Sequence, residues 1–190
     1  MVFQRLRRKL SRGQVKTLSS LNAYAKWAQT YPPYAHNPLM KVEEGAMLAQ
    51  MPDLAGKYVL DLACGTGRYS QIALARGAEA VIACDNALAM LQVGRDVETK
   101  PLYLGATTAH IPLEAHMMDV VLCGLAIGHV QDIASTLQEI SRVLKPGGVA
   151  LVSDFHPFLS LTGKKRLFTA PDGKVYAVEH YTHLIAQVFS

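Results

Sequence analysis

The sequence contains little cysteine and no long apolar run. Its three cysteines, Cys64, Cys84 and Cys123, lie at the ends of apolar runs without C-x-x-C spacing. They indicate buried, reduced thiols and favour neither a disulfide nor a zinc site, so no metal is expected. No run reaches the roughly 18 apolar residues of a membrane-spanning helix, and the N-terminus lacks the apolar core of a secretory signal. We therefore expect that the protein is not an integral membrane protein and that it is located in the cytoplasm.

Acidic residues are absent from residues 1–41, which carry eight Lys or Arg, whereas residues 42–190 carry eleven Lys or Arg and fifteen Asp or Glu. The net charge of +4 thus originates in the N-terminal segment. Three interpretations stay open for a basic tail over residues 1–17: a solvated tail, a mitochondrial transit peptide, and a contact with an anionic surface. The acidic remainder has no stripe of Lys and Arg, which disfavours nucleic acid as the main substrate.

A strand, a glycine turn and a helix start are predicted at residues 58–70, Tyr-Val-Leu-Asp-Leu-Ala-Cys-Gly-Thr-Gly-Arg-Tyr-Ser. The apolar run from Tyr58 to Ala63 predicts a buried parallel strand. Gly65 and Gly67, with one residue between them, permit positive φ and let a ligand approach the main chain. This stretch therefore predicts a ligand-binding turn.

Two acidic residues narrow the class of ligand. Asp61 lies inside the predicted strand, where a carboxylate is costly without a partner. Asp85 ends the next apolar run, residues 80–84, where an acid of a doubly wound sheet is placed to bind ribose hydroxyls. A dehydrogenase is disfavoured, because Asp61 would repel a pyrophosphate and Ser70 occupies the third glycine position of the dinucleotide fingerprint.

Predicted strands and helices alternate along the chain. The alternation predicts an α/β fold with a doubly wound, Rossmann-like parallel sheet. The strands are expected at 58–63, 80–84, 102–104, 119–127 and 149–153, and the helices at 19–30, 38–50, 68–77, 86–96 and 132–144. The length suits a single domain over 18–190, made of a helical lid (18–52), a cofactor-binding core (57–154) and a hairpin insertion followed by the start of a helix (155–190).

Three motifs carry a resemblance to a known family. They are Asp-Leu-Ala-Cys-Gly-Thr-Gly at 61–67, Cys-Asp-Asn-Ala-Leu-Ala-Met-Leu at 84–91 and Leu-Lys-Pro-Gly-Gly at 144–148. In this order they resemble the class I S-adenosylmethionine-dependent methyltransferases, in the group that includes enzymes of the ubiquinone and biotin pathways. The resemblance covers about residues 24–154 and implies S-adenosyl-L-methionine as the cofactor.

The resemblance also implies which residues bind the cofactor. By position, these are Tyr24, Asp61, Ala63, Gly65, Gly67, Asp85, Asn86, Met90, Thr107 and Thr108. Asp61 and the two glycines would line the methionine moiety, and Asp85 would bind the ribose. Thr107 stands where the family often has an Asp that accepts a hydrogen bond from the adenine amino group. A hydroxyl accepts that bond less strongly, so weaker cofactor affinity is expected.

Four aromatic residues, Tyr24, Trp27, Tyr31 and Tyr34, mark the predicted lid. One interpretation is that their rings pack a helix onto the domain, because each ring buries a large area. The other is that they cover the cofactor and substrate, as a Tyr-rich N-terminal helix does in the related methyltransferases. Both can hold for different rings, and Tyr24 is the one expected to contact ligand.

Two histidines are the candidate catalytic bases. His129 follows the fourth predicted strand, and His156 comes three residues after the fifth. Methyl transfer from a sulfonium needs a base only when the nucleophile arrives protonated. Either histidine can instead be a structural hydrogen-bonding group.

The C-terminal region predicts a β-hairpin, with strands over 165–169 and 174–181 joined by the turn Ala-Pro-Asp-Gly. A class I fold then continues with a helix and two more strands, but only residues 184–189 are available to begin that helix. The strand at 149–153 would then expose an edge. A shortened form of the chain, or a homo-oligomer that covers the edge, would account for this.

The expected function is methyl transfer from S-adenosylmethionine to a small-molecule acceptor. The alternative is a regulatory module that binds S-adenosylmethionine without turnover.

Overall fold

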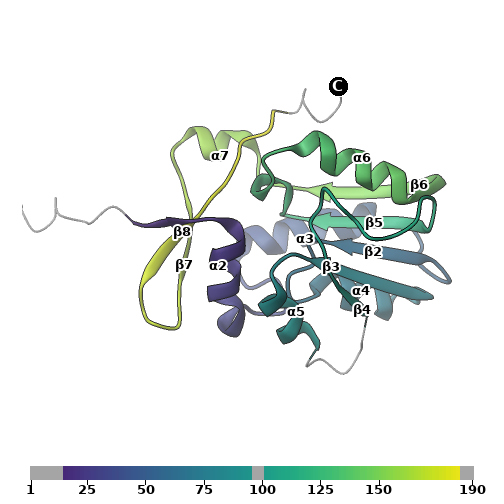
Figure 1. The fold of residues 1–190 in the computed structure, drawn as a ribbon, viewed down its shortest axis with the longest axis horizontal. Coiled ribbons are helices and arrows are strands. Elements are labelled where there is room, and N and C mark those ends of the chain that lie inside the picture. The colour runs from purple at the N-terminus through teal and green to yellow at the C-terminus, as the bar shows by residue number, and fades with distance from the viewer. Residues whose placement is uncertain (1–14, 96–100, 185–190) are drawn as a thin grey trace, which may run out of the picture.

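The computed structural model describes residues 15–95 and 101–184. Most of the predicted basic tail, and the predicted helix start after Leu184, lie outside the described residues. Helices and strands alternate through the central part of the chain (Figure 1).

A five-stranded sheet forms the centre of the molecule, and all of its neighbouring strands are parallel. Its order is β4-β3-β2-β5-β6, so the chain moves outward in one direction from β2 and then in the other from β5. The strands are β2 (Tyr58–Leu62), β3 (Ala80–Asp85), β4 (Leu102–Gly105), β5 (Met118–Gly124) and β6 (Leu144–Ser153). The prediction of a doubly wound parallel sheet is confirmed.

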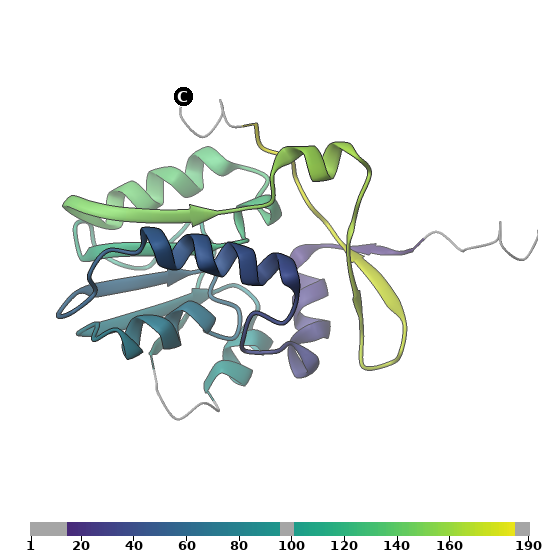
Figure 2. The same cartoon turned by 180° about the vertical axis from the view of Figure 1, so that it is seen from behind.

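Helices cover both faces of this sheet (Figures 1 and 2). On one face, α6 (Ile133–Val143) packs its apolar side on Leu60, Leu62 and other alternate strand residues. On the other face, α3 (Pro38–Gln50) and α4 (Arg68–Ala75) pack on Val59 and its neighbours. Successive side chains of a strand point to opposite faces of the sheet. Leu60 and Leu62 of β2 therefore pack on one helix layer, and Val59 packs on the other. α5 (Leu88–Arg95) connects β3 to β4.

A second, three-stranded sheet lies beside the first at the end where the lid helix α2 (Ser20–Trp27) stands (Figure 1). Its order is β1-β8-β7, with β7 (Arg166–Thr169) and β8 (Val175–Val178) forming the predicted hairpin. β1 (Thr17–Leu18) adds to β8 in parallel. Ala23 of α2 is fully buried against Phe168 and Val178, so the lid helix and the hairpin form one packed unit.

The structure corrects several predicted boundaries. β5 ends at Gly124 instead of residue 127, because Leu125 takes a φ of 56° and residues 127–129 form a 3-10 helix, η2 (Ile127–His129). Thr17, expected in the tail, belongs to β1. The helix α7 (Pro157–Leu161) was not predicted.

Two further boundaries differ at β6 and α5. β6 begins at Leu144 instead of residue 149, with a register irregularity opposite β5. α5 begins at Leu88 instead of residue 86, and Asp85 accepts a hydrogen bond from Ala87 N just before it. Within the described residues, β6 pairs with β5 alone, as expected for an edge strand.

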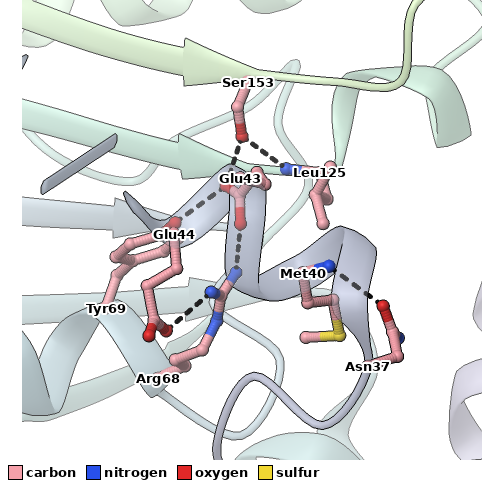
Figure 3. Close-up of polar contacts among 8 residues, drawn as sticks. All are labelled: Asn37, Met40, Glu43, Glu44, Arg68, Tyr69, Leu125 and Ser153. Atoms are coloured by element: carbon pink, nitrogen blue, oxygen red, sulfur yellow. Dashed lines mark hydrogen bonds and ion pairs between the residues drawn. The ribbon is translucent and has the colours of Figure 1, made fainter. Parts of the chain in front are cut away.

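The helix α3 is fixed to the sheet by a buried carboxylate (Figure 3). Glu43 Oε1 accepts hydrogen bonds from Tyr69 Oη (2.7 Å) and Ser153 Oγ (2.6 Å), and Glu43 Oε2 pairs with Arg68 (2.8 Å). Arg68 also pairs with Glu44 at 2.9 Å. At the other end of the close-up, Asn37 Oδ1 accepts from the Met40 amide at 2.9 Å and caps α3.

We expect Glu43→Ala to lower the free energy of unfolding by about 3–5 kcal/mol, because it leaves the buried Tyr69 hydroxyl and part of Arg68 unpaired. Glu44→Ala is the matched control: it removes the other partner of Arg68, a side chain that is 27% exposed, and should cost about 1 kcal/mol or less. Urea unfolding followed by circular dichroism measures both. Equal losses for the two variants would contradict the role assigned to Glu43.

Candidate functional site

A cavity of about 320 Å³ opens at the carboxyl ends of the central strands. It lies where the sheet order reverses, between β2 and β5, which is the usual ligand site of doubly wound folds. Ten of the twelve residues predicted for the site line it: Tyr24, Asp61, Ala63, Gly65, Asp85, Asn86, Met90, Thr107, Thr108 and His129. Gly67 and His156 do not.

The turn after β2 is built from left-handed residues. Ala63, Gly65 and Gly67 have φ values of 54°, 58° and 88°. Gly67 precedes the first residue of α4, and a Cβ on it would lie 3.0 Å from Tyr103 Oη. A glycine here therefore lets the turn pack closely against Tyr103. The predicted glycine turn is therefore present, with Gly65 facing the cavity and Gly67 supporting it.

Asp61 lies at the floor of the cavity and is 2% exposed. Its Oδ2 accepts hydrogen bonds from Ser70 N (2.8 Å) and Ser70 Oγ (2.6 Å). Burial raises the pKa of Asp61 to about 7, although the bonds from Ser70 and the charge of Arg68 act in the opposite direction. The negative charge at this position is therefore costly until a cation lies beside it.

Asp85 holds the glycine turn in place. One carboxylate oxygen accepts from Gly65 N at 2.8 Å, and the other accepts from Ala87 N at 2.7 Å. Burial raises the pKa of Asp85, and these main-chain bonds partly offset the effect. Asn86 is exposed beside it, and Met90 is buried against Ala28 of the lid.

The far wall of the cavity comes from the loop after β4. Thr107 is exposed there, in a turn closed by a bridge to His110. Thr108 lies within hydrogen-bond distance of Thr136 of α6, with 2.7 Å between the hydroxyl oxygens. This hydroxyl therefore already has a partner in the protein.

Tyr24 and His129 meet above the opening of the cavity. Tyr24 Oη lies 3.0 Å from His129 Nε2, and His129 Nδ1 lies 2.8 Å from the main-chain oxygen of Glu179. A carbonyl oxygen only accepts, so Nδ1 carries the proton and Nε2 accepts from the Tyr24 hydroxyl. Burial, followed by the charge of Arg166, lowers the pKa of His129 to about 4, and the ring is therefore neutral at pH 7.

The lid aromatics divide between the two expected roles. Tyr24 and Tyr31 line the cavity. Trp27 does not line it, and stacks on Phe168 of the hairpin with 4.8 Å between ring centroids. Tyr34 is 63% exposed. Packing accounts for Trp27, whereas the position of Tyr24 fits a contact with ligand.

His156, the second candidate base, does not line this cavity. His156 is exposed at the start of α7, where its Nδ1 accepts from Phe158 N at 3.3 Å. It lines a separate cavity of about 230 Å³ beside His180. The unpredicted helix α7 begins directly after His156.

Sequence reasoning missed Arg166 and Leu125, which both line the cavity. Arg166 had a detectable signal: Phe168 is buried and Leu167 is 51% exposed, so the alternation of the hairpin strand places Arg166 on the inner face. Leu125 had none, because its φ of 56° at the end of β5 follows from the tertiary structure.

None of the helices in the described residues combines the length and hydrophobicity needed to cross a bilayer. The same residues contain no group of three or more His, Cys, Asp or Glu side chains placed to hold a metal ion. The three cysteines are buried and free, as predicted.

The cavity-bearing core matches known proteins. Residues 60–152 match the family described as "Methyltransferase domain". Malonyl-[acyl-carrier protein] O-methyltransferase of Yersinia pestis is 35% identical over 132 residues, which cover 69% of this chain and 48% of that protein. Demethylmenaquinone methyltransferase of Thermobifida fusca is 35% identical over 115 residues, 58% of this chain and 48% of that protein. The chain thus spans about half the length of these curated relatives.

A solved structure agrees with these matches. The S-adenosylmethionine dependent methyltransferase from Mesorhizobium loti superposes with a TM-score of 0.60 at 26% identity, covering 71% of this chain and 63% of that one. The strand order, the turn after β2 and the sequence matches lead to the same assignment. The chain belongs to the class I S-adenosylmethionine-dependent methyltransferase family.

Proposed function

We propose that this protein transfers a methyl group from S-adenosylmethionine to a small-molecule acceptor. The observation that carries the proposal is the pair of buried carboxylates, Asp61 and Asp85, on either side of the Gly65 turn in a methyltransferase fold. Asp61 has a raised pKa and no cation bonded to it among the described residues, which suits a cationic ligand.

The residues present fit the cofactor. We assign Asp61, Ala63 and Gly65 to its amino-acid portion, and Asp85 and Asn86 to its ribose. Met90, Thr107 and Thr108 are assigned to the adenine, and Gly67 to supporting the turn. When bound, S-adenosylmethionine supplies an activated methyl group on a sulfonium.

The work left to the protein is positioning and exclusion of water. We assign this work to the cover over the cavity, formed by Tyr24, Tyr31 and the hairpin residue Arg166. Tyr24 is held in place by His129, whose Nε2 accepts its hydroxyl hydrogen.

His129 is the candidate proton acceptor inside the cavity, and its Nε2 could take a proton only by giving up the hydrogen bond from Tyr24. A pKa of about 4 makes it a weak base at neutral pH. It therefore suits an acceptor whose nucleophilic atom arrives without a proton. The names of the two curated relatives give different acceptors, malonyl-[acyl-carrier protein] and demethylmenaquinone, so they do not decide the substrate.

We further propose a single domain over 18–190 in a reducing, cytoplasmic compartment. The three buried free thiols support the compartment. The one-sided pairing of β6 supports contact of its edge with a second copy of the chain.

Calorimetric titration of S-adenosylmethionine, with an assay for S-adenosylhomocysteine formation across a metabolite panel, tests the proposal. Asp85→Ala should weaken cofactor binding at least about 10-fold, because it removes the ribose contact and frees the Gly65 turn. Asp53→Ala is the matched control, since Asp53 also accepts a main-chain hydrogen bond, from Ala55, but lies outside the cavity. Parent-like binding by Asp85→Ala would refute the ribose assignment. Binding without turnover would favour the regulatory module.

Cofactor affinity should depend on pH through Asp61. The ionised carboxylate attracts a cationic ligand and the protonated acid does not, so the dissociation constant should rise up to about tenfold per pH unit as pH falls below about 7. Above pH 7 it should level off. Asp61→Asn should bind weakly and show no such dependence between pH 5.5 and 8. A parent dissociation constant that is flat over this range would contradict the assignment of Asp61.

A further inference from the structure

Arg166 occupies an unusual position over the cavity. It is the first residue of β7, and its guanidinium carbon lies 5.7 Å from the centroid of Tyr24, 5.8 Å from Trp27 and 5.7 Å from Phe155. These rings come from the lid helix α2 and from the segment after β6. Arg166 also lines the cavity.

The Nη1 atom of Arg166 is buried and has no hydrogen-bond partner among the described residues. None of the ion pairs in that part of the chain includes Arg166. The other arginine of the cavity, Arg68, contrasts with it, because both of its terminal nitrogens are paired, with Glu43 and Glu44. The two arginines therefore differ: both terminal nitrogens of Arg68 are paired, whereas Arg166 has a side-chain hydrogen bond with Tyr31 and leaves Nη1 unpaired.

The charge of Asp154 acts on Arg166, but no ion pair joins the two side chains, so the buried guanidinium is only partly compensated by the protein. The faces of Tyr24, Trp27 and Phe155 compensate in part through cation–π interactions, but a ring face does not replace a hydrogen-bond acceptor. A carboxylate matches what is missing, since it accepts from the planar fork of an arginine and neutralises its charge.

We propose that Arg166 binds a carboxylate of the methyl acceptor, so that the substrates are small carboxylic acids. This proposal rests on the proposed methyltransferase function. Arg166 stands next to Tyr24 and close enough to His129 for its charge to act there. His129 follows β5, whereas Asp85 ends β3, and these two strands flank β2 on opposite sides. The cation thus lies on the half of the cavity away from the assigned ribose site.

A carboxylic acid acceptor also agrees with the weak base at His129. A carboxylate is ionised at neutral pH and needs no proton removed before it attacks a methyl group. Whether the methylated atom is that carboxylate oxygen or another atom of the acceptor is separate from the role of Arg166, which is to hold the anionic group.

One of the rings around Arg166 is Trp27, the single tryptophan of the chain. Trp27 fluorescence therefore reports on binding of a ligand to Arg166. We would titrate malonate, and the neutral isostere malonamide, into the protein with and without S-adenosylhomocysteine. We expect a saturable change with malonate and none with malonamide. Arg166→Met should raise the malonate dissociation constant at least about 10-fold. Arg166→Lys keeps the charge but loses the planar, two-pronged donor group, so its dissociation constant should lie between those of the parent and Arg166→Met.

Lys165→Met is the matched control, because it removes a neighbouring exposed cation from the same segment and should bind malonate like the parent. Thermal unfolding of each variant checks folding, and Arg166→Lys carries the test if Arg166→Met does not fold. Equal responses to malonate and malonamide, or full malonate binding by Arg166→Met, would overturn the proposal.

The cofactor carries a carboxylate too, and a second comparison separates the two sources. S-adenosylhomocysteine has the amino-acid portion and 5′-methylthioadenosine lacks it. We expect Arg166→Met to leave the calorimetric affinity for both within about threefold of the parent. A loss of about tenfold or more for S-adenosylhomocysteine alone would assign Arg166 to the cofactor and overturn the acceptor site. If neither nucleoside binds the parent while malonate still does, the methyltransferase proposal fails and the anion site stands.

Discussion

The shape of the cavity depends on one buried carboxylate. Glu43 of α3 accepts hydrogen bonds from Tyr69 and Ser153 and pairs with Arg68. The helices α3 and α4 and the edge strand β6 therefore meet at a single side chain (Figure 3). Gly124 leaves the room for this, because a Cβ there would collide with the Tyr69 ring. A buried carboxylate is tolerated only while its partners are in place, and the walls of the cavity are therefore fixed relative to one another.

The cavity combines two kinds of electrostatic environment. Its floor carries Asp61 and Asp85, both of which are harder to ionise than usual because burial raises their pKa values. Its cover carries Arg166, whose Nη1 atom has no partner among the described residues. Opposite charges facing one space suit two ligands of opposite charge bound together, and this is the arrangement we propose for a cationic cofactor and an anionic acceptor.

Sequence reasoning predicted the floor well and the cover poorly. Asp61 and Asp85 follow from local pattern, since the carboxyl ends of adjacent parallel strands must meet at one edge of the sheet. Arg166 depends on a hairpin folding back over the lid, a long-range contact that no short motif encodes. Leu125 was missed because a positive φ in a non-glycine residue has no sequence signature.

The pairing of β1 with β8 has a consequence for how the protein folds. Thr17 lies opposite Ala177, so one of the earliest described residues is held by one of the last. A ribosome therefore delivers the five-stranded sheet before the cover can close, and pairing β1 with β8 closes a longer loop than any strand pairing of that sheet. During synthesis the cavity would stay open to solvent until the hairpin emerges, so the cover assembles after the sheet.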